Sequence, residues 1–575
     1  MLLLMKKVDG TAVKYRHYKL QNKMPLLVQQ QPALALALVL ALVLAAPVAA
    51  KNRSGDETSG ARVHASKDGS VHVTSPNSVF LEPGYNGSVF IGDVDVLSAL
   101  YDLRAKYDSL ERRLPQLLAQ TVLDCSSDSS RQQLAALGVT EVSGVVDCCC
   151  DLVHNLTRVN GDVRIKPGAT AVDLGQTLVE IAGNIDGAGT SLFRNSIESL
   201  HMGRVTRVGG SIRLEHNLLS EVDFGPLAHV GGDVLLLDNK LRAFSFANIT
   251  QVHGTVDLRE NQLSVLDFSA VTYIKGDVGC NDVLTSVDFG SLRRIDGLLH
   301  LGSNRLTITL NNLTHVGETL YLNDNDFTSL SLGNLSFVGK TLHLARNFLT
   351  AIDFGQLTHV GGSILALGNR LSSLDYGRIP SVTGTLDLSD NLFTAIDVEQ
   401  LPDIGRLDAA NNPLRTFSLG SLDRFTASLD LHSTDLSSFD FGSVTDFYGN
   451  LDLSFNQLTR LDFKQVTRIV GSVQLQVNKI TAGGLSALPD VGKTLDLSLN
   501  ELRNITLYGV TALQGDLLLH GNPLRGVDFG TLTQVTGAVR LTDTRLDVVT
   551  CGEERDMCIV LDDASNATVT GCKLC

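Results

Sequence analysis

Apolar and polar residues follow a pattern that returns about every 22 positions along most of this chain. The pattern reads Val-x-Gly-x-Leu-x-Leu-x-x-Asn-x-Leu-x-x-Val-Asp-Phe-Gly-x-Leu. Its Asn position falls at residues 195, 217, 239, 261, 281, 304, 325, 347, 369, 391, 412, 434, 456, 478, 500, 522 and 544, with Thr434 and Thr544 as the two exceptions to Asn. A nearly fixed period of this length is typical of a solenoid, whose coils bury their apolar faces against each other. We therefore expect about seventeen stacked coils over residues 191–549.

Each coil combines a strand with an Asn position directly after it and an Asp-Phe-Gly triplet farther on. Leu-x-Leu has the period of a strand, with two side chains inward and one outward. The Asn amide can both donate and accept, so we expect it to bond the backbone of neighbouring coils. The Phe of Asp-Phe-Gly is expected to fill the far side of the coil, and the Gly to relax φ where the chain turns back.

These residues resemble the leucine-rich repeat family, whose signature is Leu-x-x-Leu-x-Leu-x-x-Asn-x-Leu, and in particular its extracellular type. The chain departs from the signature because Gly occupies the first leucine position, as in Gly231, Gly317 and Gly361. The Val-Gly-Gly and Asp-Phe-Gly elements also give a weaker likeness to receptor L-domain repeats. The resemblance implies a curved solenoid with a parallel β-sheet on its concave side and less regular structure on its convex side.

The first 50 residues have the layout of a secretory signal. Lys6, Lys7 and further basic residues precede an uncharged run over 33–46 and then Pro47-Val-Ala-Ala50. A run of this length is short for a membrane span, which needs about 20 residues. We expect residues 1–50 to be a signal peptide and the protein to be secreted or held at the cell surface. The alternative is an uncleaved signal anchor, which would make it a type II membrane protein.

Between the signal and the coils lie two further segments. Residues 51–75 are polar and are expected to be a flexible linker. Residues 76–124 contain short strand-like runs and then an apolar heptad seam from Val96 to Leu114, which Pro115 ends. The seam is either an amphipathic helix docked on the first coil or a short coiled coil that makes the protein a homo-oligomer.

Eight of the nine cysteines lie outside the coils. They form one group before the first coil and one after the last, at Cys125, Cys148, Cys149, Cys150, Cys551, Cys558, Cys572 and Cys575. Because a solenoid exposes its core at each end, we predict disulfide caps over 125–190, together with a degenerate first repeat, and over 550–575. Cys280 occupies a leucine position inside a coil and is expected to be a buried thiol.

Asn-x-Ser/Thr sequons also point to the secretory pathway. They are candidates for glycosylation at Asn52, Asn86, Asn155, Asn248, Asn312, Asn334, Asn504 and Asn566. Three of them, Asn248, Asn312 and Asn334, follow their coil's Asn position by eight or nine residues. Glycans there would leave the concave sheet bare.

No catalytic or nucleotide-binding motif occurs in the chain, so we expect neither an enzyme nor a cofactor, a metal or a small-molecule substrate. The outward position at mid-strand does carry a pattern, because Asp387, Asp408, Asp430, Asp452 and Asp496 hold it in five of six successive coils. Leu-Asp-Leu-Ser is a common form of this repeat, so the acidic strip is either ordinary strand sequence or a surface for a basic protein partner or Ca²⁺. With a formal charge of −15, nucleic acid is a poor partner.

Two functions are open to such a chain. The first is a secreted protein that recognises another protein through its concave face, in adhesion or cell-surface interaction. Its candidate contacts are the five aspartates and a mixed surface of Tyr321, His343 and Arg346. The second is an oligomeric, glycosylated structural or matrix component that residues 76–124 cluster.

Overall fold

In the computed structural model the chain forms two compact units, residues 1–147 with 152–160 and residues 148–151 with 161–575. The described residues are 62–65, 71–74, 90–91, 94–95, 123–124, 141–142, 144–148, 156–190, 194–280, 283–306, 310, 312–399, 403–481, 488–551, 556–561, 568–570 and 573–574. Every regular element among them is a β-strand. No helix in these ranges is long and apolar enough to cross a membrane. The signal segment and the heptad seam lie outside them.

Among the described residues of the first unit, short strands form four pairs, and one of these strands, β7, ends one residue beyond the boundary at Asp147. Strands β1 and β2 pair antiparallel, as do β3 and β4, whereas β5 pairs parallel with β7 and β6 with β8. Their bounds are β1 Arg62–Ala65, β2 Val71–Thr74, β3 Phe90–Ile91, β4 Val94–Asp95, β5 Leu123–Asp124, β6 Glu141–Val142, β7 Val146–Cys148 and β8 Arg158–Val159. Strands β1 and β2 lie within residues 51–75, which were expected from the sequence to be a flexible linker, whereas β3 and β4 lie within 76–124, where short strands were expected.

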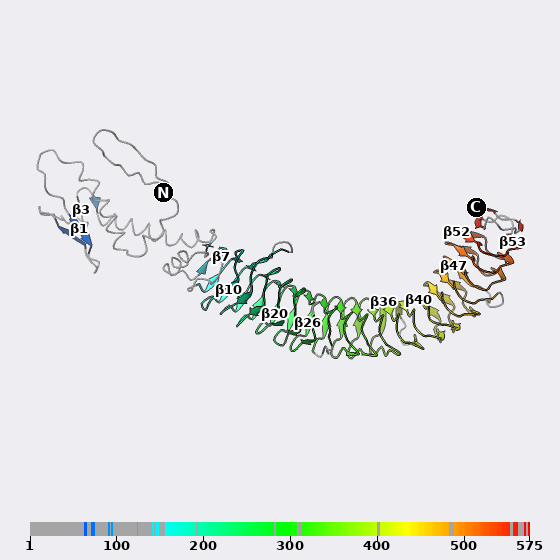
Figure 1. The fold of residues 1–575 in the computed structure, drawn as a ribbon, viewed down its shortest axis with the longest axis horizontal. Coiled ribbons are helices and arrows are strands. Elements are labelled where there is room, and N and C mark those ends of the chain that lie inside the picture. The colour runs from blue at the N-terminus through cyan, green and yellow to red at the C-terminus, as the bar shows by residue number, and fades with distance from the viewer. Residues whose placement is uncertain are drawn as a thin grey trace, which may run out of the picture. The chain divides into compact units, whose positions relative to one another are not determined.

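The second unit is a parallel β-solenoid, as predicted. One strand of each coil joins a long sheet, the main sheet, in which each strand pairs in parallel with the next coil's strand (Figure 1). It contains β9 Val163–Ile165, β12 Ile185–Asp186, β15 Ile212–Arg213, β18 Val234–Leu235, β21 Val256–Asp257, β24 Val278–Gly279, β27 Leu299–His300, β29 Leu320–Tyr321, β32 Leu342–His343, β35 Ile364–Leu365, β36 Ser381–Asp387, β37 Asp403–Asp408, β40 Ser428–Asp430, β43 Leu451–Asp452, β45 Val473–Gln474, β47 Leu495–Asp496, β50 Leu517–Leu518, β52 Gln534–Arg540, β54 Asp556–Val560 and β56 Lys573–Leu574. Within this unit the stack curves, and β36 and β40 lie on its inner side (Figure 1). The pairing of β9 with β12 and of β54 with β56 carries the sheet beyond 191–549 at both ends.

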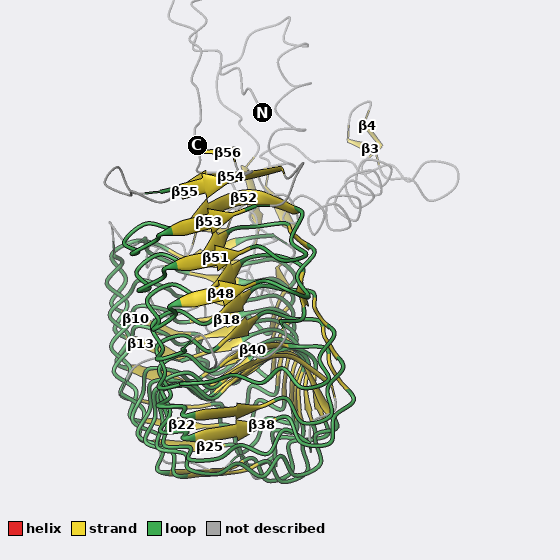
Figure 2. Ribbon diagram, turned by 90° about the vertical axis from the view of Figure 1, so that its right-hand side faces the viewer, coloured by secondary structure: helices red, strands yellow, loops and turns green. Residues whose placement is uncertain are grey.

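In many coils two other sides carry short parallel strands, so such a coil has three strand positions joined by turns (Figure 2). The second position holds β11 Glu180–Ile181, β14 Arg207–Val208, β17 His229–Val230, β20 Gln251–Val252, β23 Tyr273–Ile274, β26 Arg294–Ile295, β28 His315–Val316, β31 Phe337–Val338, β34 His359–Val360, β39 Arg424–Phe425, β42 Asp446–Phe447, β44 Arg468–Ile469, β46 Asp490–Val491 and β49 Ala512–Leu513. The third holds β10 Ala171–Asp173, β13 Ser199–His201, β16 Glu221–Asp223, β19 Ala243–Ser245, β22 Val265–Asp267, β25 Ser286–Asp288, β30 Ser329–Ser331, β33 Ala351–Asp353, β38 Thr416–Ser418, β41 Ser438–Asp440, β48 Asn504–Thr506, β51 Gly526–Asp528, β53 Val548–Thr550 and β55 Thr568–Thr570.

The repeated Asn residues form a buried ladder between coils. In one example, Asn391 Nδ2 donates to the carbonyl oxygens of Ala366 at 2.9 Å and Leu388 at 3.1 Å. Its Oδ1 accepts the N–H of Leu371 at 2.9 Å, and only 4% of Asn391 is exposed. The structural role predicted for these amides is confirmed, although residue 281 lies outside the described ranges.

The Asp-Phe-Gly triplet is a turn that also supplies core. In the coil of β33, Asp353 Oδ1 accepts the N–H of Gly355 at 2.9 Å, and Gly355 has a φ of 55°. The Phe354 side chain between them is buried. The same holds where the triplet recurs, so its Phe residues line the core, as expected. Cys280 is a buried thiol at a leucine position of the core, also as expected.

Close approach of neighbouring coils explains the glycine that replaces the first leucine of the signature. A Cβ built on Gly231, Gly317 or Gly361 would collide with a backbone carbonyl oxygen of the preceding coil. These three glycines are not in the left-handed region of φ, so space and not backbone conformation excludes a side chain there. The chain turns into the main sheet where no side chain can be accommodated.

A second polar ladder precedes many strands of the main sheet. The N–H of Asp233 donates to Ser211 Oγ at 2.9 Å, and the N–H of Thr255 donates to Asp233 Oδ1 at 2.8 Å. Farther along, the N–H of Leu298 donates to Asp277 Oδ1 at 2.9 Å. Short side chains thus accept hydrogen bonds from backbone N–H groups that strand pairing does not satisfy at the turn before the strand.

Candidate functional site

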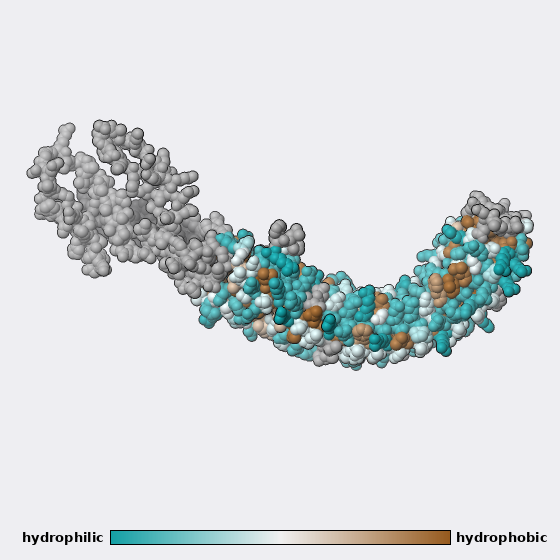
Figure 3. Space-filling model, in the orientation of Figure 1, coloured by the Kyte–Doolittle hydropathy of each residue, from teal (hydrophilic) through white to brown (hydrophobic). Residues whose placement is uncertain are grey.

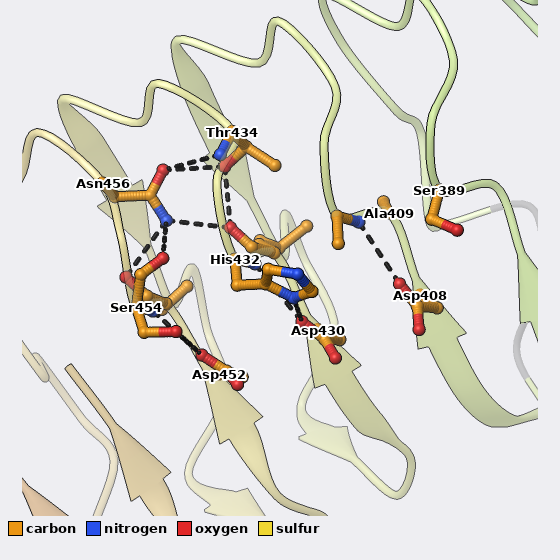
Figure 4. A network of polar contacts seen from close by, with 12 residues as sticks. Ser389, Asp408, Ala409, Asp430, His432, Thr434, Asp452, Ser454 and Asn456 are labelled. Atoms are coloured by element: carbon orange, nitrogen blue, oxygen red, sulfur yellow. Dashed lines mark hydrogen bonds and ion pairs between the residues drawn. The ribbon is translucent and has the colours of Figure 1, made fainter. Parts of the chain in front are cut away.

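The main sheet brings the five predicted aspartates into one line, which we call the acidic column. Asp387, Asp408, Asp430, Asp452 and Asp496 end strands β36, β37, β40, β43 and β47. Strand register places Asp387, Asp408, Asp430 and Asp452 directly beside one another, and Gln474 of β45 separates the fourth from Asp496. Figure 4 shows three of these carboxylates on neighbouring strands.

Each of these carboxylates also closes a local turn. Asp452 Oδ1 accepts the N–H of Ser454 at 2.9 Å and its hydroxyl at 2.6 Å. Asp387 and Asp496 accept the same two bonds from Ser389 and Ser498. The N–H groups of Ala410 and His432 lie 3.3 Å from Oδ1 of Asp408 and Asp430. The acidic column therefore has a structural role of its own, independent of any partner.

A guanidinium and an imidazole lie within the acidic column. Arg406 Nη2 bridges Asp408 Oδ2 at 2.9 Å and Asp430 Oδ2 at 2.8 Å, and His432 Nδ1 lies 2.7 Å from Asp430 Oδ1. The side chains of Asp408 and Asp430 are only 17% and 15% exposed. The column is thus a half-buried line of charge rather than a fully solvated face.

Burial and mutual repulsion shift the ionisation of this line. Burial raises the pKa of Asp408 above its ordinary value, and the carboxylates of Asp430 and Asp387 raise it further. Burial likewise raises the pKa of Asp452, against the opposing bonds from Ser454. Burial lowers the pKa of His432, but its hydrogen bond to Asp430 and the nearby carboxylates outweigh that effect and raise it.

Asp430, His432 and Asp452 are close enough to suggest a cation site, because one ligand atom from each lies within 4.8 Å of the others. The atoms of Asp430 are already engaged, however, with Oδ1 on His432 and Oδ2 on Arg406. An Arg guanidinium on the same carboxylate competes with any metal ion. We read this cluster as an internal ion-pair network.

The mixed surface predicted from the sequence is also assembled, on β27, β29 and β32. The ring of Tyr321 lies 4.9 Å from that of His300 and 5.7 Å from that of His343 between centroids. Arg346 Nη1 lies 3.4 Å from Asp324 Oδ1 in the preceding coil. Burial lowers the pKa of His300 and of His343, so both imidazoles favour their neutral form. This surface is aromatic and weakly charged, unlike the acidic column.

Another line of rings, partly exposed, lies at the second strand position, where no feature was identified from the sequence. The rings of His315 and Phe337 stack at 4.3 Å, and those of Phe337 and His359 at 4.6 Å. His, Phe or Tyr occupies the position immediately before the buried Val or Ile in five coils, at His229, Tyr273, His315, Phe337 and His359. That recurrence in the printed sequence was the available signal.

The residue before each ladder Asn forms a further line that sequence reasoning missed. It has a positive φ in coil after coil, so we call it the left-handed column. Its non-glycine members include His216, Asp238, Glu260, Ser303, Asp324, Arg346, Asp390, Asn411, Ser433, Phe455, Val477, Leu499 and Asp543. Residue types at this position are too varied to reveal a shared backbone conformation.

The described sequons lie away from the main sheet. Asn248 and Asn334 follow the third-position strands β19 and β30, Asn504 begins β48, and all three are exposed, as is Asn312. The sequons at 52, 86, 155 and 566 fall outside the described ranges.

Among the predicted cap cysteines, Cys551 is buried and is disulfide-bonded in the structure. Cys148 and Cys558 lie in β7 and β54. Cys125, Cys149, Cys150, Cys572 and Cys575 lie outside the described ranges, so the pairing within each cap stays a prediction.

Comparisons with known proteins bear on the fold alone. No family model and no curated protein matches the chain. Among solved structures it is similar to YopM from Yersinia enterocolitica WA-314, with 18% identity and a TM-score of 0.41 over 79% of this chain and 94% of that one. It is also similar to YopM, a leucine-rich effector protein from Yersinia pestis, with 17% identity and a TM-score of 0.32 over 64% of this chain and 88% of that one. A third similarity is to the functional domain of InlJ from Listeria monocytogenes, with 17% identity and a TM-score of 0.25 over 48% and 64%. At these values the similarities carry nothing about ligands, and the assignment of a leucine-rich repeat solenoid rests on the register, the Asn ladder and the core of this chain.

Proposed function

We propose that this chain is a secreted recognition protein that binds a basic protein partner on its main sheet, in adhesion or another cell-surface interaction. The observation that carries the proposal is the acidic column, five aspartates at one register position of a parallel sheet. A line of like charges raises the local concentration of a cationic partner and orients its approach. The formal charge of −15 extends the same preference over the whole chain.

Several features of the sequence support the compartment and the mode of action. The basic and apolar N-terminal layout, the terminal cysteines and the sequons all belong to the secretory pathway. The exposed Asn248, Asn312 and Asn334 lie off the main sheet, so glycans on them would leave its outer face accessible. A stacked surface without a catalytic motif works by shape and charge, without turnover.

The test is capture followed by affinity measurement. The full-length protein is immobilised, extracellular fluid of its source is passed over it, and captured proteins are identified by mass spectrometry. Binding of each is then measured at several salt concentrations for the wild type and for the triple variant Asp408→Asn, Asp430→Asn and Asp452→Asn. We expect the variant to bind more weakly and with a flatter salt dependence, because fewer charges are left to screen.

A matched control removes three carboxylates elsewhere. Asp288, Asp353 and Asp528 at the third strand position are exposed, and each accepts the N–H of a following glycine. Their triple change to Asn alters net charge and turn chemistry in the same way but leaves the main sheet intact. Equal loss of binding in the column variant and in the control variant would show that overall charge causes the loss. Unaltered affinity and salt dependence in the column variant would refute the acidic column as the contact surface.

A further inference from the structure

Three successive coils place apolar residues in the left-handed column. Phe455, Val477 and Leu499 have φ values of 54°, 53° and 54°. A non-glycine residue rarely adopts this conformation, and a β-branched residue such as Val is the least suited to it. Most other coils use a polar residue or glycine there, such as Glu260 or Gly521. We call Phe455, Val477 and Leu499 the apolar ridge.

Two members of the apolar ridge contribute little to the core of the solenoid, whereas the third, Val477, is only partly exposed. Phe455 is 54% exposed and Leu499 is 51% exposed. The Leu499 side chain lies over Gly521 of the next coil, because a Cβ built on that glycine would collide with it. Large apolar side chains held exposed in an uncommon backbone conformation point to a surface function, since folding alone does not require them.

The apolar ridge runs directly beside the acidic column. Each member lies three residues after the end of its main-sheet strand, with Asp452 before Phe455, Gln474 before Val477 and Asp496 before Leu499. The N–H of Phe455 donates to the carbonyl of Gln476 at 2.9 Å, and that of Leu499 to the carbonyl of His520 at 2.9 Å. Neighbouring coils therefore fix the spacing of the ridge. Figure 3 shows hydrophobic surface on the solenoid near the place where Figure 1 labels β47.

We propose that the apolar ridge, together with Asp452 and Asp496, docks a segment of a partner protein in which apolar side chains lie beside lysine or arginine. The inference rests on the proposed function and specifies the chemistry of its partner. The parallel charged and apolar lines favour a partner with both features. A second copy of this chain or an anionic membrane would bring like charge against the column, and the formal charge of −15 opposes both.

The test uses three labelled synthetic peptides of equal length, composed of Lys with Leu, Lys with Ser, and Glu with Leu. The ridge variant is Phe455→Asn, Val477→Asn and Leu499→Asn in the full-length protein. Because Asn tolerates positive φ, these changes should leave the melting temperature unchanged or raise it, so that lost binding cannot be ascribed to unfolding. Glu260→Asn is the matched control at the same column position in a distant coil.

We expect the Lys–Leu peptide to bind the wild type more tightly than the other two, and to bind the ridge variant about tenfold more weakly, as loss of one buried apolar side chain would give. The Glu260→Asn control should bind as the wild type does. The Lys–Ser and Lys–Leu peptides could instead bind with equal affinity, and lose binding only in the triple variant of Asp408, Asp430 and Asp452. That result would overturn the proposal for the apolar ridge but leave the acidic column as the binding surface. If neither lysine peptide binds the wild type, the ridge proposal and the proposed function both fail. Concentration-dependent dimerisation that is lost in the ridge variant would show that a second copy of this chain covers the ridge, and would overturn the proposal. Binding to anionic vesicles that is lost in the ridge variant would overturn it in favour of a membrane.

Discussion

The Thr434 hydroxyl lies 2.9 Å from Oδ1 of Asn456, its counterpart in the next coil of the ladder. The same oxygen accepts the N–H groups of Thr434 at 3.1 Å and Leu436 at 2.9 Å (Figure 4). Thr lacks the NH₂ group with which the described Asn residues of the ladder donate to backbone carbonyls, for example Asn478 to Leu453 O at 2.9 Å. Continuity is kept because Asn456 reaches across with both its oxygen and its nitrogen, the latter donating to Leu431 O at 2.8 Å.

Replacing Asn456 with Ala should destabilise the chain by about 1–3 kcal/mol, because buried backbone donors and acceptors lose their partners. Asn391→Ala and Asn369→Ala should cost similar amounts, since their amides bond neighbouring coils in the same way. Chemical denaturation followed by circular dichroism measures the loss. The exposed Gln457 provides a control whose change to Ala should leave the midpoint unchanged. Wild-type midpoints for all three Asn variants would contradict the ladder's structural role.

Neutralising the acidic column should leave stability at neutral pH unchanged or slightly higher. In the variant Asp408→Asn, Asp430→Asn and Asp452→Asn each amide oxygen can still accept the N–H two residues on, so the turns survive. The repulsion among adjacent carboxylates is removed, at about a few tenths to 1 kcal/mol per directly adjacent pair. A clear drop in the melting temperature would show instead that Arg406 and His432 depend on these carboxylates for stability.

The same variant should show a distinct pH dependence. The folded-state pKa of Asp408 and of Asp452 lies above the ordinary value of 3.8, so the folded chain binds protons more tightly than the unfolded chain. Their ionisation therefore costs stability above the raised pKa, and this cost disappears as pH falls through it. The raised pKa of His432 acts in the same direction, because its contribution is complete below 6.5 and is lost as pH rises through the raised value.

The wild type should consequently gain stability relative to the triple variant as pH is lowered from neutral toward about 4. Melting of both proteins in matched buffers across this range gives the difference directly. Using the difference removes the opposing effect of His300 and His343, whose pKa values are lowered in both proteins. A difference that does not vary with pH would contradict the half-buried state of the column.

Gly339→Ala should be strongly destabilising, because its Cβ would collide with the carbonyl oxygen of Gly317 in the preceding coil. Forcing neighbouring coils apart costs about 1–3 kcal/mol and occasionally more. Gly526→Ala is the control, since its Cβ would meet only the Asn504 side chain, at 3.3 Å. Equal melting temperatures for the two variants would show that the coils have room to separate.

Replacing Cys551 and Cys572 with Ser should lower stability by about 2–5 kcal/mol, as loss of a native disulfide does. Cys551 is buried and disulfide-bonded at the end of the last coil, where an exposed core needs closing. Mass spectrometry of secreted material under non-reducing conditions identifies the pairs. Finding all eight terminal thiols reduced would remove the basis for the caps.

The sequence predicted those features for which one residue type is chemically required. Buried amides such as Asn456, core rings such as Phe354 and turn glycines such as Gly355 recur at a fixed spacing because no other residue performs their role there. The strand that carries Asp430 followed from the same spacing. What the spacing could not reveal was that Asp430 is half-buried and bound by Arg406 and His432, since that depends on side-chain orientation across coils.

The left-handed column escaped prediction for a different reason. The N–H of the column residue donates to a carbonyl of the next coil, as His216 does to Leu237 and Arg346 to Leu367. Neighbouring coils thus impose the conformation, and residue type carries no signal. The polar ladder of Asp233, Thr255 and Asp277 could have been found, because short acceptors recur immediately before the apolar residue of the strand.

The constancy of that backbone has an evolutionary consequence. His216, Arg346 and Phe455 share φ values of 55°, 52° and 54° despite having unrelated side chains. Each coil therefore presents one interchangeable side chain at a fixed pitch of about 4.8 Å, the spacing of neighbouring strands. Point substitutions at this position can change the side chain that the surface presents while the scaffold stays the same. Duplication or loss of a whole coil would add or remove one member of the left-handed column and move the following members by one strand spacing, without changing their side chains.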